Sequence, residues 1–144
     1  MEKYEELKMH SASTDKSVEL PLAQGGISAG FPSPADDPME LKLDLNKELI
    51  RNAASTFFAR VSGVSMIDDG VNDGDLLVID KSVEPYDGCL AVCFIDGEFT
   101  LKRFNDNGDH ALLVPANKDY KSIKVTEDND FMIWGVVRYL IKKM

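Results

Sequence analysis

Short apolar runs separated by turn residues dominate the chain after residue 56. The runs cover residues 57–61, 76–80, 90–95, 99–104, 111–115, 122–125 and 131–141. Asp73-Gly74 precedes the second run and Asp96-Gly97 joins the third to the fourth, and both pairs are typical of tight turns between strands. Seven short strands with this spacing predict a mostly β fold, either a curved antiparallel sheet or a partly closed barrel.

One short helix is expected before the first of these strands. Leu45 and Leu49 are four residues apart, so they share one face of a helix, and Asp44 is a suitable N-cap. We therefore predict a short helix over residues 44–52.

The first 40 residues do not have the pattern of a packed unit: the first ten allow a short helical turn, but no 3.6-residue period is sustained. Pro32, Pro34 and Pro38 exclude a helix there and favour extended backbone, whereas glycines earlier in this segment favour flexibility. The sequence thus predicts two parts, a flexible N-terminal arm over residues 1–40 and a β-rich domain over residues 41–144.

The charge of the chain limits the kinds of partner it can bind. The 144 residues carry a formal net charge of -9. A reader of duplex DNA needs a basic surface, so we expect no direct sequence-specific DNA binding. No apolar stretch has the length of about 20 residues that spans a bilayer, and the charged N-terminus is not a secretory signal. We therefore expect a cytoplasmic protein without a membrane partner.

The cysteines and histidines indicate neither a disulfide nor a metal site. Cys89 and Cys93 would stand roughly 13 Å apart on one strand, which is too far for a bridge, so buried reduced thiols are expected. Only His10 and His110 could add further nitrogen ligands. We predict no metal and no cofactor.

A candidate nucleophile lies in the loop that follows the first predicted strand. Gly63 permits a sharp turn that exposes the hydroxyl of Ser65, and neighbouring backbone N–H groups can form an oxyanion site. We assign Gly63 and Met66 to the support of this loop and of the oxyanion site. The alternative is an ordinary loop in which serine hydroxyls cap backbone groups.

Lys102 is the candidate base that activates Ser65. Neither His10, in the predicted arm, nor His110, near a turn with no acidic neighbour arranged to orient it, is well placed for this role. On a strand, Thr100 and Lys102 share one face while Arg103 lies on the other, so Lys102 can face inward. To act as a base it must lose about 3 units from a pKa of about 10.4, which burial can supply. The alternative is a surface lysine.

Three motifs in order resemble the LexA/UmuD family of self-cleaving serine peptidases. They are Ser62-Gly63-Val64-Ser65-Met66, Asp73-Gly74-Asp75-Leu76-Leu77 and the run from Asp96 to Arg103, which includes Thr100-Leu101-Lys102. Ala29-Gly30-Phe31-Pro32 also resembles the cleavage segment of UmuD-type SOS mutagenesis proteins. The resemblance covers about residues 29–141. Two positions depart from the UmuD-type pattern, namely Val64 in place of an acidic residue and Ala29 in place of cysteine.

The resemblance implies a site and a set of partners. Ser65 would be the nucleophile, Lys102 the general base and Ala29–Gly30 the bond that is cut. The implied protein is a homodimer that removes its own arm on a RecA filament in the SOS response. The trimmed form would then serve an error-prone, UmuC-like translesion DNA polymerase.

Several other interpretations stay open. A LexA-like repressor, or a fragment of one, is the nearest, although 29 residues before the proposed cut are too few for a helix-turn-helix domain. Signal peptidases also use a serine and a lysine, but they work at a membrane. A non-enzymatic β adaptor would dock its arm on a partner. The segment 131–137 is a candidate dimer interface or a core strand.

Overall fold

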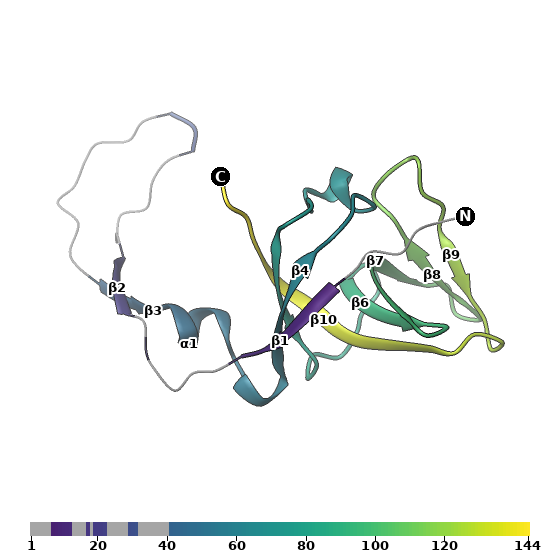
Figure 1. The fold of residues 1–144 in the computed structure, drawn as a ribbon, viewed down its shortest axis with the longest axis horizontal. Coiled ribbons are helices and arrows are strands. Elements are labelled where there is room, and N and C mark those ends of the chain that lie inside the picture. Colours follow the sequence, from purple (N-terminus) through teal and green to yellow (C-terminus); the bar gives the residue numbers. More distant parts are fainter. Residues whose placement is uncertain (1–6, 13–16, 18, 23–28, 32–40) are drawn as a thin grey trace. The chain divides into compact units, whose positions relative to one another are not determined.

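The computed structural model describes residues 7–12, 17, 19–22, 29–31 and 41–144. These residues form two units (Figure 1). The first unit combines the described part of Met1–Ala12 with Asn52–Met144, and the second comprises the described part of Ser13–Arg51. Each unit is described by itself below.

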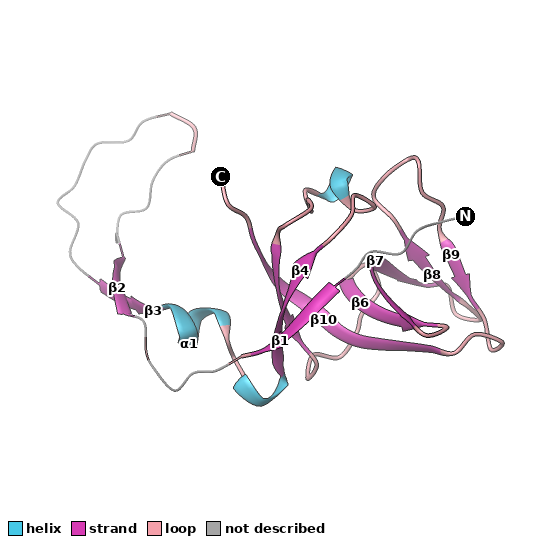
Figure 2. Ribbon diagram, viewed as in Figure 1, coloured by secondary structure: helices cyan, strands magenta, loops and turns pink. Residues whose placement is uncertain are grey.

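The first unit is built on one antiparallel sheet of eight strands in the order β1-β4-β5-β10-β6-β7-β8-β9 (Figure 2). Among the described strands, β1 and β9 lie at the two ends of this order, so the sheet is open rather than a closed barrel. The mostly β, antiparallel architecture expected from the sequence is confirmed. The strands are β1 (Leu7–Ser11), β4 (Thr56–Val61), β5 (Leu76–Asp80), β6 (Leu90–Ile95), β7 (Glu98–Asp106), β8 (Ala111–Val114), β9 (Ile123–Val125) and β10 (Phe131–Ile141).

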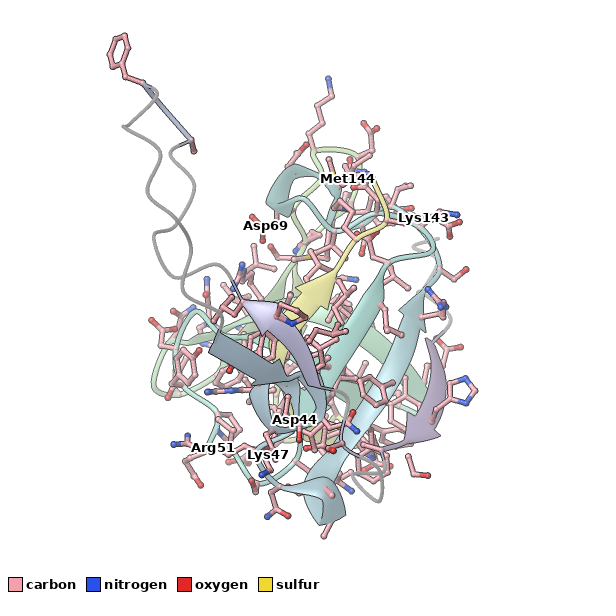
Figure 3. The ribbon with its side chains drawn as sticks, turned by 90° about the vertical axis from the view of Figure 1, so that its left-hand side faces the viewer. Asp44, Lys47, Arg51, Asp69, Lys143 and Met144 are labelled. Atoms are coloured by element: carbon pink, nitrogen blue, oxygen red, sulfur yellow. The ribbon has the colours of Figure 1, made fainter. Side chains whose placement is uncertain are left out.

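The second unit contains β2 (Glu19–Leu22), β3 (Leu41–Asp44) and the short helix α1 (Leu45–Leu49). β2 and β3 pair antiparallel. Asp44, which is labelled in Figure 3, caps α1 as predicted, since its Oδ1 accepts a hydrogen bond from the N–H of Asn46 at 3.0 Å. The helix ends at Leu49, earlier than expected, because Ile50 has extended backbone with φ -117°.

These units differ from the predicted division between residues 40 and 41. Residues 7–11 form β1, which pairs with β4 of the eight-stranded sheet, from Leu7 opposite Val61 to Ser11 opposite Phe57. Residues 41–49, placed in the β-rich domain by the sequence, belong to the second unit. Flexibility of the arm stays a prediction.

The core of the first unit consists of two hydrophobic clusters. The first gathers Ala59, Val61, Met66, Val71, Leu77, Ile79, Val92 and Leu101, and the second gathers Cys89, Ala91, Cys93, Ile95, Leu113, Val125 and Val136. Both cysteines are buried free thiols, as expected. Burial, with a smaller contribution from Cys89, raises the pKa of Cys93 to about 12.

β10 crosses the middle of the sheet and carries two irregularities. It pairs with β5 on one side and with β6 on the other, so the segment proposed as a dimer interface is a central strand. The register shifts against β6 between Ile133 and Gly135 and against β5 between Val137 and Tyr139. Gly135 approaches β5 so closely that a Cβ there would lie 2.5 Å from Cγ2 of Ile79. A side chain at this position would therefore clash.

Asp80, at the end of β5, is a buried carboxylate held by three hydrogen bonds. Its Oδ1 accepts from the Ser55 hydroxyl at 2.7 Å, the Ser82 hydroxyl at 2.7 Å and the Ser82 N–H at 2.8 Å. Burial alone would raise the pKa of Asp80, but these bonds outweigh it, so the pKa lies below its usual value. The group therefore stabilises the folded state in its ionised form.

In the part of the chain that the structure describes, no helix has both the length and the apolar character needed to cross a membrane.

Candidate active site

Ser65 lies in the loop between β4 and the short 3-10 helix at Ile67–Asp69. Gly63 has φ 107°, which favours glycine, and its N–H donates to Oδ1 of Asp73 at 3.0 Å. Gly74 closes the neighbouring turn by donating its N–H to the carbonyl of Val61 at 2.8 Å. The predicted glycine-dependent path of the loop is therefore present, and a second loop supports it.

Met66 fixes the other side of the nucleophile loop. Its side chain is fully buried in the first core cluster. Its carbonyl accepts hydrogen bonds from the N–H groups of Asp69 at 3.1 Å and Val71 at 3.2 Å. Gly63 and Met66 thus both hold the loop, whereas their contribution to an oxyanion site stays a prediction.

Lys102 lies on β7, opposite Ala91 of β6, and only 1% of it is exposed. The next residue, Arg103, points the other way and forms an ion pair with Asp69 at 3.0 Å, a residue labelled in Figure 3. The alternation predicted for this strand therefore places the arginine at the partly exposed face and the lysine inside. The surface-lysine alternative is wrong.

The two side chains meet as the sequence predicts. Lys102 Nζ lies 2.9 Å from Ser65 Oγ, and both residues are buried. Nζ also contacts Thr100 Oγ1 at 2.9 Å and the Leu101 carbonyl oxygen at 3.1 Å. These three oxygens are neutral, and burial disfavours the ammonium form. A neutral amine at this place can accept the proton of the Ser65 hydroxyl, which is the requirement for a serine nucleophile.

Thr100 is a member of this cluster for which the sequence suggested no role. Strand alternation places Thr100 and Lys102 on the same face, and the structure shows the threonine fully buried with its hydroxyl against Nζ. The i, i+2 spacing on one strand was the available signal. The contact restricts where the amine can point.

A third segment, the loop between β8 and β9, also holds the loop that carries Ser65. The Ala116 N–H donates to the carbonyl of Ser65 at 2.8 Å, and the Ala116 carbonyl accepts from the N–H of Asp68 at 2.7 Å. Nδ2 of Asn117 donates to the carbonyl of Val64 at 2.9 Å. No local pattern in the sequence connects residues roughly 50 positions apart, so this support could not be predicted.

One expectation about His110 was wrong. We expected no acidic neighbour arranged to orient this ring, but His110 Nδ1 lies 2.7 Å from Oδ1 of Asp109. The hydrogen bond to His110 also lowers the pKa of Asp109. His10 lies on β1, opposite Phe58. Asp109 and His110 are neighbours in the sequence at a turn, and the alternation of apolar residues along strands does not report whether two such neighbours form a hydrogen bond.

Ala29 and Gly30 belong to the second unit. They lie in a bend and both are exposed, as is Phe31, whose exposed fraction is 93%. Because this unit is described by itself, the delivery of the Ala29–Gly30 bond to Ser65 stays a prediction. Pro32 and Pro34 lie outside the described residues.

Within the described ranges, no group of three or more histidine, cysteine, aspartate or glutamate side chains has the arrangement to hold a metal ion.

Comparison with known proteins agrees with the site geometry. Residues 21–138 match the model of the family described as Peptidase S24-like. Protein MucA of Salmonella typhimurium is 38% identical over 130 residues, which cover 90% of this chain and 88% of MucA. Protein SamA of the same species (strain LT2) is 44% identical over 123 residues, 85% of each chain. LexA repressor 1 of Xanthomonas axonopodis is 37% identical over 132 residues, 92% of this chain but 65% of the repressor. The chain therefore belongs to the Peptidase S24-like family.

Proposed function

We propose that this protein is a self-cleaving serine peptidase in which Ser65 and Lys102 hydrolyse the Ala29–Gly30 bond, either in their own chain or in a second copy of it. The observation that carries the proposal is the 2.9 Å contact between Ser65 Oγ and Lys102 Nζ in a buried site. Membership of a serine peptidase family supports the assignment of this pair.

The chemistry follows from the atoms of the pair. Neutral Lys102 takes the hydroxyl proton as Ser65 Oγ attacks the Ala29 carbonyl carbon, which gives a tetrahedral oxyanion. The Ala29–Gly30 C–N bond then breaks, and the Lys102 ammonium returns its proton to the Gly30 amine. Water hydrolyses the ester between Ser65 and Ala29, with Lys102 again as the base. The products are residues 1–29 with a new carboxylate and a chain that begins at Gly30.

The cleavage segment suits this reaction. Ala29 and Gly30 are small, and the prolines at positions 32 and 34 favour an extended backbone, which can bind beside a sheet edge as an added strand. The exposure of residues 29–31 is consistent with a segment that an active site has to reach.

In the cell, this reaction would act as a switch. We infer that a RecA filament stimulates cleavage by stabilising the docked pose of the arm, a population shift that needs no change in the chemistry. The trimmed protein would then act as a homodimer and as an accessory subunit of a UmuC-like translesion polymerase in SOS mutagenesis. The removal of residues 1–29 would change what the remaining domain binds.

Intact mass measurement tests the proposal. Purified protein held at about pH 10, near the reference pKa of a free lysine, should yield a fragment that begins at Gly30. Ser65→Ala and Lys102→Ala should stay intact. Ser62→Ala and Lys124→Ala are matched controls, because Ser62 is an exposed serine of the same loop and Lys124 an exposed lysine of the same sheet, and both should cleave like the wild type.

Two results would contradict this function. Wild-type protein that stays intact at alkaline pH and also with RecA filaments would exclude self-cleavage. Equal cleavage in Ser65→Ala would exclude the assigned nucleophile. Unchanged chain length together with unchanged cellular function in Ser65→Ala would favour the non-enzymatic β adaptor.

A further inference from the structure

The side chain of Asn117 holds the peptide group that leads into Ser65. Nδ2 of Asn117 donates to the Val64 carbonyl at 2.9 Å, and the same carbonyl accepts from the N–H of Ile67 at 3.2 Å. Directly beside this contact, the Ala116 N–H donates to the Ser65 carbonyl at 2.8 Å. Two consecutive peptide groups, on either side of the Ser65 α-carbon, are therefore held by one loop.

The orientation of the Asn117 amide is fixed by its partners. Its Oδ1 accepts the N–H of Asp119 at 2.9 Å, while its Nδ2 donates to the Val64 carbonyl. A backbone N–H can only donate and a carbonyl can only accept, so the reversed amide would lose both hydrogen bonds. The turn from residue 117 to 120 adds a third contact, from the Tyr120 N–H to the Asn117 carbonyl at 3.0 Å. The donor thus has one well-defined position.

Fixing these carbonyls also fixes the N–H groups beside the nucleophile. In a planar trans peptide the carbonyl and the following N–H point in opposite directions. The contact to Val64 therefore sets the direction of the Ser65 N–H, and the contact to the Ser65 carbonyl sets that of the Met66 N–H. Stabilisation of an oxyanion depends on donors whose direction is set before the reaction.

We propose that Asn117 is a positioning residue for the peptidase reaction. Its side chain holds the Val64–Ser65 peptide so that the Ser65 N–H is directed for the tetrahedral oxyanion, while the backbone of the adjacent Ala116 holds the Ser65–Met66 peptide. This inference rests on the proposed function of Ser65 and Lys102. Asn117 acts through the backbone of the nucleophile loop and has no role in setting the protonation of Lys102.

Asn117→Asp separates this role from simple support of a turn. Aspartate keeps the oxygen that accepts the Asp119 N–H but has no NH2 group to donate to Val64. Asn129→Ala is a matched control, because Asn129 also holds a turn, with its Oδ1 accepting the Thr126 N–H at 3.0 Å and its Nδ2 donating to Asp96 at 2.9 Å. The turn of Asn129 lies between β9 and β10, and the side-chain hydrogen bonds of Asn129 are to Thr126 and Asp96 rather than to the Ser65 loop.

The full-length variants are compared by their cleavage rate as a function of pH. Removal of one direct oxyanion donor typically lowers a rate about 100-fold or more, so loss of a group that orients the donors should lower the alkaline plateau about tenfold or more. We expect this for Asn117→Asp and Asn117→Ala, with the midpoint pH unchanged, and a rate within about twofold of wild type for Asn129→Ala. A wild-type plateau in Asn117→Asp, or a shifted midpoint with the plateau kept, would overturn the proposal.

A second measurement does not depend on cleavage. The backbone amide resonances of Ser65 and Met66 should shift in Asn117→Asp and stay in place in Asn129→Ala, and unchanged resonances in Asn117→Asp would also overturn the proposal. If the wild type does not cleave, the proposed function fails, while the amide comparison still decides whether Asn117 orients the loop. If the wild type cleaves and Asn117→Asp matches it, only the role of Asn117 fails.

Discussion

The pH dependence of self-cleavage should depend on the contacts of the Lys102 amine, and Thr100→Val changes one of them with little change in shape. The substitution replaces a buried hydroxyl by a methyl group and removes the 2.9 Å contact to Nζ. The contacts from Nζ to Ser65 and to the Leu101 carbonyl are kept. The variant therefore isolates the effect of one oxygen on the balance between amine and ammonium.

The size of the effect follows from the two protonation states. A hydrogen bond to a charged group contributes about 1.5–3 kcal/mol and one between neutral groups about 0.5–1.5 kcal/mol. Loss of the Thr100 hydroxyl should therefore destabilise the ammonium form by about 1 kcal/mol more than the neutral amine. At about 1.4 kcal/mol per pH unit, the midpoint of the cleavage rate should move about 0.7 unit toward lower pH. The plateau should fall, because the amine loses a contact that directs it.

The assay is the rate of appearance of the two fragments, by intact mass, from about pH 6 to about pH 10, which spans the expected titration of the base. Thr56→Val is the matched control, since Thr56 is also buried and its hydroxyl donates to the Asn52 carbonyl at 2.6 Å. This control should lose stability but keep the midpoint. A midpoint in Thr100→Val that stays in place or moves to higher pH would refute the reasoning, as would an equal shift in Thr56→Val.

Three further predictions concern stability and reactivity. Asp80→Asn should reduce the free energy of unfolding by about 2 kcal/mol at neutral pH. Since the folded pKa of Asp80 is lowered, its contribution is complete above about pH 4 and is lost as pH falls through the folded pKa, so urea denaturation should show the difference narrowing in acid. Cys93, with a pKa of about 12, should react with iodoacetamide at about pH 8 only after unfolding, as detected by mass spectrometry. Gly135→Ala should destabilise by about 1–3 kcal/mol, because its Cβ would lie 2.5 Å from Cγ2 of Ile79, and Ile79→Ala should relieve part of this cost in a double-mutant cycle.

Each of these has a clear contrary result. An Asp80→Asn difference that stays constant down to acid pH would mean that the charge of Asp80 is not what stabilises the fold. Labelling of Cys93 in the folded protein would show that its thiol is accessible and ionised. Additive effects of Gly135→Ala and Ile79→Ala would show that the two side chains do not compete for the same space.

The sequence predicted the parts of the site that depend on local patterns. Strand alternation placed Lys102 and Arg103 on opposite faces of β7, and the structure buries Lys102 while Arg103 is partly exposed, although Leu101 on the face of Arg103 is buried as well. The Asp96-Gly97 pair marked the turn between β6 and β7, where both residues have positive φ. Asp44 marked the start of α1. In each case the cause lies within a few residues, so a pattern can report it.

Other features depend on contacts that leave little local trace. β1 pairs with β4 through its backbone. Backbone pairing does not require an alternating apolar pattern, so no pattern in the sequence marked this segment as an edge strand. Asn117 supports Ser65 from a loop after β8, and only the folded sheet brings these segments together. Thr100 had the right spacing to meet Lys102, but a shared face does not specify a hydrogen bond. The motif resemblance identified the reacting residues, and the structure added the groups that hold them.

The position of β1 has a consequence for the timing of the switch. β1 precedes the proposed cut, yet five of its residues pair with β4. Hydrolysis at Ala29 would turn one chain into a two-chain complex rather than free the fragment at once. Departure of residues 1–29 would then be a dissociation step with its own rate constant, set by backbone pairing and not by the chemistry. On departure, the backbone of β4 would become an open edge that ends four residues before Ser65.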